Sequence, residues 1–380
     1  MPNARPRNLA LRSTITSGGR LSLSVAEVPV EAPGDGEILV QVEAAPINPS
    51  DLLNLLGPAE VSSMAAAGSG SRRVLTATVP ESRLPAFKAR LDQAVPIGYE
   101  GAGTVVAAGP GLKHLLGKKV SALAGGMFCR YRTISAELCV VLPDGASAAE
   151  GAALLVNPLT ALAMVETMRR EGHRALVHTA AASNLGQMLT RICQIDGIDL
   201  VNIVRSQAQV DLLKAMSVRY VVNSTAADFR SELADAIAAT DATIAFDAVG
   251  GGRLAHQILR AMEAVARRRV QGVPYGSDGK KQLYVYGRLD RSALEFDWDY
   301  GTRWSVGIFI MTNALQDVGA ARAAELRDRI VREMKTTFAS RYAGTIGLFD
   351  LLDPQILAEI AKMATGQKYL LDPTRHSGSA

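Results

Sequence analysis

The sequence predicts an α/β protein in which a β-rich part is joined to a doubly wound parallel sheet. Its 380 residues exceed the ~100–150 residues typical of one hydrophobic core, so two domains are expected. The first hundred and fifty residues carry short β-branched runs bounded by Gly and Pro, which are typical of strands. From about Leu154 onward, apolar runs alternate with helical segments, which predicts parallel βαβ units with right-handed crossovers.

Strand patterns dominate the N-terminal part. The runs are LSLSVAEVPV at 21–30, EILVQVEAAPI at 37–47 and GTVVAAGPG at 103–111. An inserted segment is predicted from Pro58 to Ala94, because it opens with a Ser-, Ala- and Gly-rich stretch. It continues into a strand-like run at 72–80 and a helical run at 81–93.

Strands and helices then alternate in the order expected for βαβ units. The predicted strands are ALVH (175–178), LVNIV (200–204), RYVVN (219–223), ATIAFDAVG (242–250) and QLYVYG (282–287). The predicted helices are GQMLTRICQI (186–195), QVDLLKAM (209–216), DFRSELADAIAA (228–239) and RLAHQILRAMEAV (253–265). Periodicity does not decide between strand and buried helix for 305–315, and an amphipathic helix is predicted over 318–337.

Composition narrows the class of protein. The net charge of +4 suits an anionic small ligand but is too small and dispersed to indicate a nucleic-acid surface. Three cysteines, Cys129, Cys139 and Cys193, form neither a disulfide framework nor a Cys-x-x-Cys site, which favours free thiols in a reducing compartment. We expect a cytoplasmic protein, because no apolar run of about 18 residues and no secretory signal pattern is found.

The stretch VHTAAASNLGQML, from Val177 to Leu189, has the layout of a dinucleotide-binding turn. The glycine fingerprint needs small residues for a tight turn, for close approach to the pyrophosphate and for helix–strand packing. Here its positions are Ala181, Ser183 and Gly186, so small residues replace two of the glycines. The following helix offers N–H groups and the positive end of its dipole, which bind anions.

The dinucleotide is predicted to be NADP rather than NAD. The acidic residue that hydrogen-bonds a ribose 2′-OH about 20 residues after the fingerprint is absent. Arg205 and Ser206 stand at the end of the next strand instead. An arginine can pair with a 2′-phosphate, which a carboxylate would repel, so NADPH is the expected cofactor.

Several segments together resemble the medium-chain dehydrogenase/reductase superfamily, and within it the zinc-independent quinone oxidoreductase and enoyl reductase branches. They run in the family's order: AAPINPSDLL (44–53), PIGYEGAGTVVAAG (96–109), VNPLTALAMV (156–165), the turn above, IAFDAVGG (244–251) and ATGQKYLLDP (364–373). The resemblance implies a GroES-like catalytic domain over 1–153, interrupted by the insertion at 58–94. It also implies a Rossmann domain over 154–302 and a return to the catalytic domain over 303–380.

The resemblance further implies a cleft for cofactor and substrate, and a homodimer formed through an edge strand near Trp304 to Met311. Zinc-dependent relatives place their ligands at positions that correspond to Ser50, Tyr99 and Val156. These residue types do not build a zinc site, so no metal is expected.

Site residues follow from the same resemblance. Asn48 would lie beside the nicotinamide and substrate, supported by Asp51, although Asp51 is also a plausible helix cap. Thr160 would contact the nicotinamide. Ser183, Asn184, Leu185 and Gly186 would hold the pyrophosphate, while Gly250 and Gly251 shape a turn beside the cofactor.

The proton donor is left open. A tyrosine that some relatives carry is replaced here by Leu53, which leaves Tyr99, Tyr131 or solvent as candidates. The Lys and Tyr that some relatives use on the 2′-phosphate are replaced near Gln209 and Ser224. His178 is expected to be structural.

The leading hypothesis is an NADPH-dependent reductase that transfers a hydride to a quinone or an α,β-unsaturated carbonyl compound. An enoyl thioester reductase is the alternative, because ASNLGQ followed by NIVR is closer to that branch, and the insertion could wall a groove for a pantetheine arm or form a lid. A hypothesis of another class is a nucleotide- or RNA-binding protein without catalysis, similar to zeta-crystallin, to which the basic run Arg267 to Arg269 would contribute.

Overall fold

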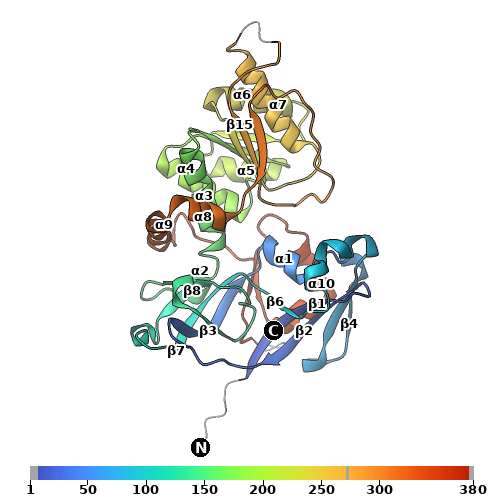
Figure 1. Cartoon of the computed structure of the whole chain (residues 1–380), viewed down its shortest axis with the longest axis vertical. Coiled ribbons are helices and arrows are strands. Elements are labelled where there is room, and N and C mark those ends of the chain that lie inside the picture. Colours follow the sequence, from blue (N-terminus) through green and yellow to red (C-terminus); the bar gives the residue numbers. More distant parts are fainter. Residues whose placement is uncertain (1–6, 271–273, 376–380) are drawn as a thin grey trace, which may run out of the picture. The chain divides into compact units, whose positions relative to one another are not determined.

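The computed structural model describes residues 7–270 and 274–375 (Figure 1). The chain divides into two compact units. The first consists of Met1–Val156 together with Ile330–Ala380, and the second of Asn157–Arg329. Helix α2 (Ala148–Gly151) lies in the first unit, and α3 (Val156–Arg170) lies almost entirely in the second.

The first unit contains two mainly antiparallel sheets. One has the strand order β4-β5-β2-β1-β6. Its strands are β1 (Asn8–Ile15), β2 (Arg20–Val28), β4 (Ala65–Ala67), β5 (Val74–Thr78) and β6 (Val95–Pro96). Alternating buried and exposed residues along β2 place Leu21, Leu23 and Val25 in a core that α1 (Pro49–Leu55) and α10 (Pro354–Ala361) also enter.

The other sheet joins both ends of the chain. Its order is β10-β8-β7-β3-β18-β17, with β9 also paired to β3. The strands are β3 (Glu37–Pro46), β7 (Glu100–Ala108), β8 (Lys119–Leu123), β9 (Tyr131–Ser135), β10 (Cys139–Val141), β17 (Gly344–Ile346) and β18 (Tyr369–Leu371). Because β18 pairs with β3, the C-terminal segment is part of the same sheet as the N-terminal strands.

The segment 58–94 extends the first sheet. Strand β5 pairs with β2 and β4 pairs with β5, and the short 3-10 helices η1 (Val61–Ser63) and η2 (Gly70–Arg72) flank β4. The run at 81–93 forms the 3-10 helix η3 (Glu81–Arg90) rather than an α-helix. Pro85 lies inside it and has no N–H for an α-helical hydrogen bond.

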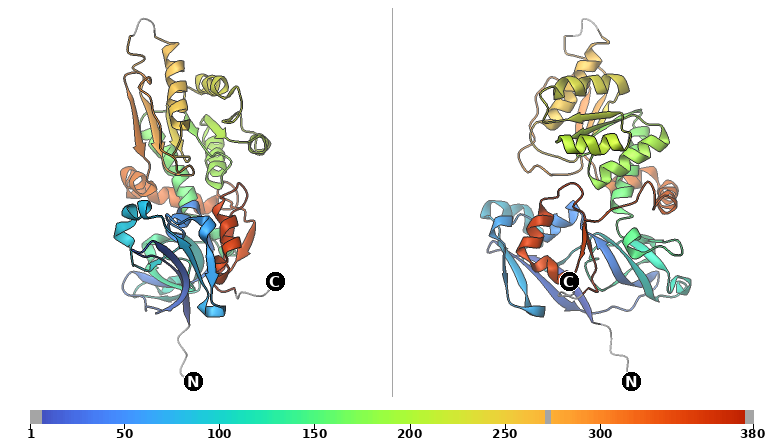
Figure 2. Two further views of the ribbon diagram at one scale, coloured as in Figure 1. Left: turned by 90° about the vertical axis from the view of Figure 1, so that its right-hand side faces the viewer. Right: turned by 180° about the vertical axis from the view of Figure 1, so that it is seen from behind.

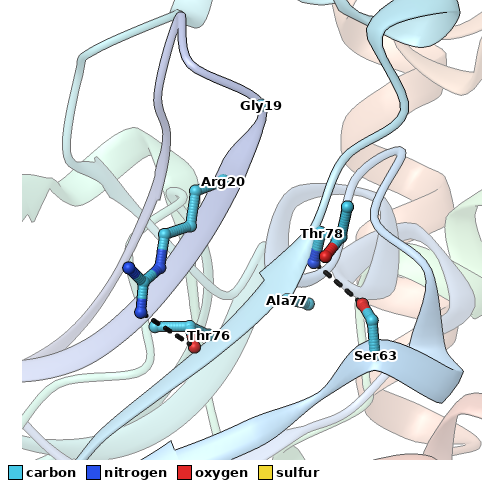
Figure 3. A pocket seen from close by; sticks show the side chains of 6 residues that line it. All are labelled: Gly19, Arg20, Ser63, Thr76, Ala77 and Thr78. Atoms are coloured by element: carbon cyan, nitrogen blue, oxygen red, sulfur yellow. Dashed lines mark hydrogen bonds between the residues drawn. The ribbon is translucent and has the colours of Figure 1, made fainter.

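A polar pocket lies where this segment meets β2. In Figure 3, Arg20 Nη2 donates to Thr76 Oγ1 at 3.3 Å, and the Thr78 N–H donates to Ser63 Oγ at 2.8 Å. Gly19 and Ala77 complete its lining. These bonds tie η1 and β5 to the hairpin of β1 and β2.

The remaining short helices of the first unit connect strands or precede α10. They are η4 (Lys113–Leu115), η5 (Ala136–Leu138) and η6 (Leu348–Leu352).

The second unit is a six-stranded parallel sheet with the order β13-β12-β11-β14-β15-β16. Its strands are β11 (Leu176–His178), β12 (Leu200–Val204), β13 (Tyr220–Asn223), β14 (Ile244–Asp247), β15 (Lys281–Val285) and β16 (Trp304–Ile308). This is the 3-2-1-4-5-6 order of the Rossmann fold, whose direction of strand progression reverses between β11 and β14. The predicted α/β fold class is therefore confirmed.

Helices alternate with the strands from β11 to β15, as the sequence predicts, whereas β16 follows β15 without a helix between them (Figures 1 and 2). They are α4 (Asn184–Asp196), α5 (Gln207–Ala215), α6 (Phe229–Thr240), α7 (Leu254–Arg267), α8 (Met311–Val318) and α9 (Ala320–Arg332). Residues of α6 and α7 share one core with the strands, and α5 packs with Ala181 and Val204 in another.

One stretch, Ala148–Arg170, is long and apolar enough to cross a membrane, contrary to the expectation that no such run exists. Most of it is buried within the protein, and core helices of soluble proteins pass the same test of length and composition.

The segment from 303 to 329 belongs to the second unit, because β16 pairs in parallel with β15. The ambiguous run at 305–315 contains both alternatives, since β16 is followed directly by α8. Within the described residues no further strand pairs with β16, and Ile308 and Ile310 near its end are exposed. Dimerisation through this edge stays a prediction.

A buried ion pair holds the loop before β15 against α7. Lys281 and Glu263 have side chains only 1% and 3% exposed, with 2.8 Å between Nζ and Oε2. Lys281 also donates to Ser277 Oγ at 2.8 Å and to the Gly279 carbonyl at 2.9 Å, which uses all three of its N–H bonds. Burial alone would raise the pKa of Glu263, but hydrogen bonds from Lys281, Ser277 and Arg267 outweigh it and bring the pKa to about 2.

Replacing Lys281 should destabilise the protein far more than replacing its neighbour. Lys281→Met leaves Glu263 buried without its main partner, a change that typically costs about 3–5 kcal/mol. Lys280→Met removes only an exposed contact with Glu171 and should cost less than about 1 kcal/mol. Urea unfolding of both variants measures the difference, and equal losses of stability would contradict the structural role given to Lys281.

Candidate active site

Helix α1 begins at a turn that fixes a buried carboxylate. The Asn48 N–H donates to Asp51 Oδ2 at 2.8 Å, and the Tyr99 N–H donates to Asp51 Oδ1 at 2.9 Å. Asp51 is fully buried. It therefore caps the helix, as one of the two sequence interpretations holds, and it also links α1 to the segment that precedes β7.

The Asn48 side chain does not cap the helix but joins the buried Glu100 to the half-buried Lys368. Its Nδ2 donates to Glu100 Oε1 at 2.8 Å, and Lys368 Nζ donates to its Oδ1 at 2.8 Å. The second carboxylate oxygen, Glu100 Oε2, accepts the N–H groups of Leu155 and Val156, each at 2.9 Å. We refer to Asn48, Asp51, Glu100 and Lys368 as the polar corner.

Burial shifts the pKa of each ionisable residue of the polar corner, Asp51, Glu100 and Lys368. It raises the pKa of Asp51 to about 7, although the two backbone N–H donors oppose this. It also raises the pKa of Glu100 and lowers that of Lys368, while Lys368 and the carboxyls each favour the other's charged form. Groups perturbed in this way by burial and by specific partners are common where protons are held or moved.

Sequence reasoning singled out Asn48 and Asp51 but not Glu100 or Lys368. Both missed residues lie inside segments that carry the family resemblance, GYEGAG and GQKYLL. The available signal for Glu100 was a carboxylate at the start of an otherwise apolar strand, which requires a partner when it is buried. The partner, Lys368, is 268 positions away in sequence, and periodicity carries no information on that pairing.

The tyrosine candidates have different surroundings. Tyr99 is 38% exposed, and its hydroxyl oxygen accepts a hydrogen bond from Asn54 Nδ2 at 2.9 Å. Tyr131 begins β9 and is bound through its backbone to Asn8. Leu53, on α1, is exposed.

The positions that correspond to zinc ligands in relatives carry other groups. Ser50 is exposed on α1, Tyr99 contacts Asn54, and the N–H of Val156 donates to Glu100. Across 7–270 and 274–375, no cluster of three or more His, Cys, Asp or Glu side chains could hold a metal ion.

In the second unit, the turn after β11 has the geometry of a phosphate-binding loop. Ser183 is the N-cap of α4, and its Oγ accepts the Gly186 N–H at 3.1 Å, which leaves the hydroxyl hydrogen able to donate. A Cβ at Gly186 would lie 2.2 Å from the Ala181 carbonyl oxygen, so only glycine permits this approach of the helix to the turn that precedes it. Asn184 and Leu185 form the first turn of α4, and the buried Thr160 lies in α3.

Two further turns, one after β14 and one after β15, lie at the same carboxyl edge of the sheet. Asp247 ends β14 and accepts the N–H groups of Val249 and Gly250, while Thr179 Oγ1 donates to Asp247 at 2.7 Å. Gly250 has a φ of +67°, and a Cβ there would lie 2.1 Å from the Gly287 carbonyl oxygen. This edge, at the switch between β11 and β14, is where open α/β sheets bind ligands.

Gly251 and His178 have structural surroundings in the same region. A Cβ at Gly251 would lie 2.7 Å from the Asp290 carbonyl oxygen. His178 is fully buried, which lowers its pKa to about 3, and its Nε2 lies 2.7 Å from the Tyr286 hydroxyl.

Arg205 directly follows β12 at this edge. Its side chain is exposed, and within the described parts of the chain no carboxylate pairs with it. Ser206 is the N-cap of α5, and the side-chain Oε1 of Gln209 accepts a hydrogen bond from the Arg205 N–H at 3.0 Å. Ser224 follows the neighbouring strand β13, and its N–H donates to the Val204 carbonyl. An unpaired cation beside a phosphate-binding turn fits a phosphorylated dinucleotide.

The basic run Arg267 to Arg269 is largely neutralised. Arg267 pairs with Glu263 and Asp299, and Arg269 pairs with Asp241 at 2.7 Å. These pairs reduce the positive potential that binding to a nucleic-acid backbone requires.

Comparisons with known proteins agree with this architecture. Residues 34–144 match the alcohol dehydrogenase GroES-like domain. A Mesorhizobium loti protein assigned by its name as an NADPH:quinone reductase is 25% identical, covers 97% of this chain and 100% of its own, and has a TM-score of 0.71. Escherichia coli quinone oxidoreductase in complex with NADPH is 17% identical, with coverage of 96% and 100% and a TM-score of 0.67. The CurK enoyl reductase is 17% identical, with coverage of 97% and 99% and a TM-score of 0.68.

Curated relatives include much longer proteins. A mycocerosic acid synthase-like polyketide synthase of Mycobacterium tuberculosis is 26% identical over 280 residues, which are 72% of this chain and 12% of that protein. The chain thus spans about an eighth of that relative's length.

The fold class defined by these findings is a GroES-like domain combined with a Rossmann-like region. Its neighbours are quinone oxidoreductases and enoyl reductases, so the resemblance to the zinc-independent branch of the medium-chain dehydrogenase/reductase superfamily is confirmed.

The raised pKa of Asp51 predicts how its contribution to stability changes with pH. The folded protein retains a proton on Asp51 up to about pH 7, whereas an unfolded aspartate loses it near pH ~3.9. The Asp51 contribution to the free energy of unfolding should therefore fall as pH rises from about 4 to about 7. Asp51→Asn removes this titration, so the stability of the wild type relative to the variant should decrease over that range.

Urea unfolding at several pH values measures this difference, with the exposed Asp35→Asn as the control carboxyl in the same unit. A difference between wild type and Asp51→Asn that does not change with pH would contradict the assignment.

Proposed function

We propose that the chain is an NADPH-dependent oxidoreductase that transfers a hydride to a quinone or an α,β-unsaturated carbonyl compound without a metal ion. The observation that carries the proposal is the phosphate-binding turn at Ser183 to Gly186 with the unpaired Arg205 on the neighbouring strand. The fold shared with quinone oxidoreductases and enoyl reductases supports the reaction class.

The residues of the second unit fit the cofactor. Ser183, Asn184, Leu185 and Gly186 would hold the pyrophosphate at the start of α4, where the helix dipole favours anions. Arg205 and Ser206 would bind the 2′-phosphate. Thr160 would contact the nicotinamide, whose hydride is the chemistry that the cofactor supplies.

The polar corner would stabilise negative charge that develops on the substrate oxygen. Lys368 donates to Asn48 Oδ1, which orients the amide so that its second N–H can donate outward. The half-buried ammonium of Lys368 next to this donor adds positive potential beside the buried Glu100 and Asp51. Asp51 fixes the backbone at both Asn48 and Tyr99, so it would hold both residues in place.

An enoyl thioester reductase is the second candidate within the same reaction class. The match to polyketide synthases over 72% of this chain favours it, as does the fold shared with the CurK enoyl reductase. The non-catalytic RNA-binding alternative is less well supported, because Arg267 and Arg269 are engaged in ion pairs.

Absorbance at 340 nm, with NADPH and a panel of quinones, free enones and 2-enoyl-CoA thioesters, tests the proposed function. We expect oxidation of NADPH with at least one acceptor class. A rate that is at least tenfold higher for thioesters than for free enones would select the enoyl thioester reductase. No oxidation with any acceptor would contradict the reductase function.

Arg205 should decide between the two dinucleotides. Arg205→Glu places a carboxylate where the 2′-phosphate is expected, so NADPH binding should weaken by about 10- to 100-fold while NADH binding changes little. Quenching of protein fluorescence measures both dissociation constants. Arg219→Glu, an exposed arginine just before β13 at the opposite edge of the sheet, is the matched control. Equal losses for NADPH and NADH would contradict the role of Arg205.

A further inference from the structure

The inserted segment 58–94 contains an arginine, Arg90, that is linked to Tyr99 through Asn54. Arg90 ends η3, and its Nη2 donates to Ser13 Oγ at 3.2 Å and to the Asn54 carbonyl at 3.1 Å. The same Asn54 donates through its side chain to the Tyr99 hydroxyl oxygen at 2.9 Å. One residue of α1 therefore touches both the guanidinium and the phenol.

Arg90 has an uncommon environment for an arginine. It is partly buried, and its Nε is shielded from solvent without a hydrogen-bond partner. No carboxylate forms an ion pair with it among residues 7–270 and 274–375. Burial lowers the pKa of Arg90, and attraction to a Tyr99 phenolate opposes this shift. A desolvated guanidinium is costly unless a negative charge approaches it, and the phenolate of Tyr99 is such a charge.

The position of η3 is fixed from both sides. The strand that precedes it, β5, pairs with β2, and Val79 donates to the Gly19 carbonyl at 2.8 Å. After η3, the Asp92 N–H donates to the Ile15 carbonyl at 2.8 Å, and Asp92 Oδ1 accepts the Ser17 N–H. Phe87 lies under the guanidinium, with 5.9 Å from Arg90 Cζ to the ring centroid. Arg90 is thus held in place by β1, α1 and its own helix.

We propose that Tyr99 is the proton donor to the α-carbon of an α,β-unsaturated carbonyl substrate, and that Arg90 and Asn54 position it and stabilise its phenolate. Because Asn54 donates to the phenol oxygen, the hydroxyl hydrogen remains available for transfer. This inference rests on the proposed reductase function. It assigns to the insertion a part in the chemistry, in addition to its place in the sheet.

The step balances as follows. Hydride addition to the β-carbon moves the C=C electrons towards the carbonyl and leaves an enolate. The Tyr99 O–H bond then breaks, its proton forms the new C–H bond at the α-carbon, and the electron pair stays on the phenolate beside Arg90. Tyr99 is 38% exposed, so water can return the proton.

Quinones and enones differ in the atom that must be protonated after hydride transfer, which is oxygen in a quinone and carbon in an enone. Hydride transfer to a quinone gives a hydroquinone anion, whose oxygen exchanges protons directly with water. An enolate instead needs a proton at carbon, for which a positioned acid contributes typically ~10²–10⁴-fold in rate. Loss of the proton donor should therefore slow enone reduction and spare quinone reduction.

The experiment compares kcat for an enone and for a quinone in wild type and in Tyr99→Phe, Arg90→Gln, Arg90→Lys and Arg83→Gln. Tyr99→Phe and Arg90→Gln should lower the enone rate by at least ~10-fold and keep the quinone rate within ~3-fold. Arg90→Lys keeps the charge and should recover most of the enone rate. Arg83→Gln is the matched control in η3, because among the described residues Arg83 donates to the Pro58 carbonyl and not to Asn54 or Ser13.

A second readout needs neither cofactor nor substrate. Tetranitromethane nitrates tyrosines through the phenolate, so nitration of Tyr99 relative to the 82% exposed Tyr275 reports how well the phenolate is stabilised. Mass spectrometry of the peptides should show a lower Tyr99 to Tyr275 ratio in Arg90→Gln and an unchanged ratio in Arg83→Gln. If Arg90→Gln fails to fold, Asn54→Ala tests the other partner of the phenol, because it removes the side-chain donor to the Tyr99 oxygen and keeps the backbone carbonyl that binds Arg90; its Tyr99 to Tyr275 ratio should fall as well.

The outcomes separate this inference from the proposed function. A wild type that oxidises NADPH with no acceptor contradicts the proposed function. An active wild type whose enone and quinone rates fall together in Arg90→Gln, or do not change, overturns the role of Arg90. An unchanged nitration ratio in Arg90→Gln overturns it as well.

Discussion

The carboxylate of Glu100 is the constraint on which the first unit depends. A buried anion must be matched by donors, and here the donors come from three distant segments: Asn48 at the start of α1, the backbone at Leu155 and Val156, and Lys368 through Asn48. Three parts of the chain must therefore meet at Glu100: the N-terminal strands, the segment that leads into the second unit, and the C-terminal segment. The pairing of β18 with β3 completes that requirement.

In the second unit, the geometry of the backbone, rather than a buried charge, is the main constraint on the turns at the carboxyl edge of the sheet. The approach of α4 to β11 at Gly186 and the turn at Gly250 both require the absence of a side chain. Ser183 and Ser206 each cap a helix at the carboxyl edge of the sheet, so the first turns of α4 and α5 are fixed before any ligand arrives. Buried charge constrains the first unit and backbone geometry the second.

The sequence was most informative where a local pattern determines the structure. Alternating apolar runs predicted the order of strands and helices in the second unit, and small residues predicted the turn after β11. The sequence pattern predicted a helix over 81–93 but not its 3-10 form. The helical spacing of the residues does not show that Pro85 lacks the N–H needed for an α-helical hydrogen bond. Glu100, Lys368 and Arg90 were missed for another reason: their partners are brought together only by tertiary structure, and no spacing along the chain encodes that proximity.

The two hydrogen-bonded ends of the insertion have a consequence for the history and engineering of this protein. Because η3 enters from β5 and leaves at Asp92, both bound to the hairpin of β1 and β2, the path of the segment between them is fixed at both ends. Its side chains nevertheless reach beyond it, because Arg90 binds Ser13 and Asn54 and Phe87 packs against the core of the first unit. Substitutions within the ten residues of η3 can therefore change the surroundings of Tyr99 while they leave the hydrogen bonds among the residues of the polar corner in place.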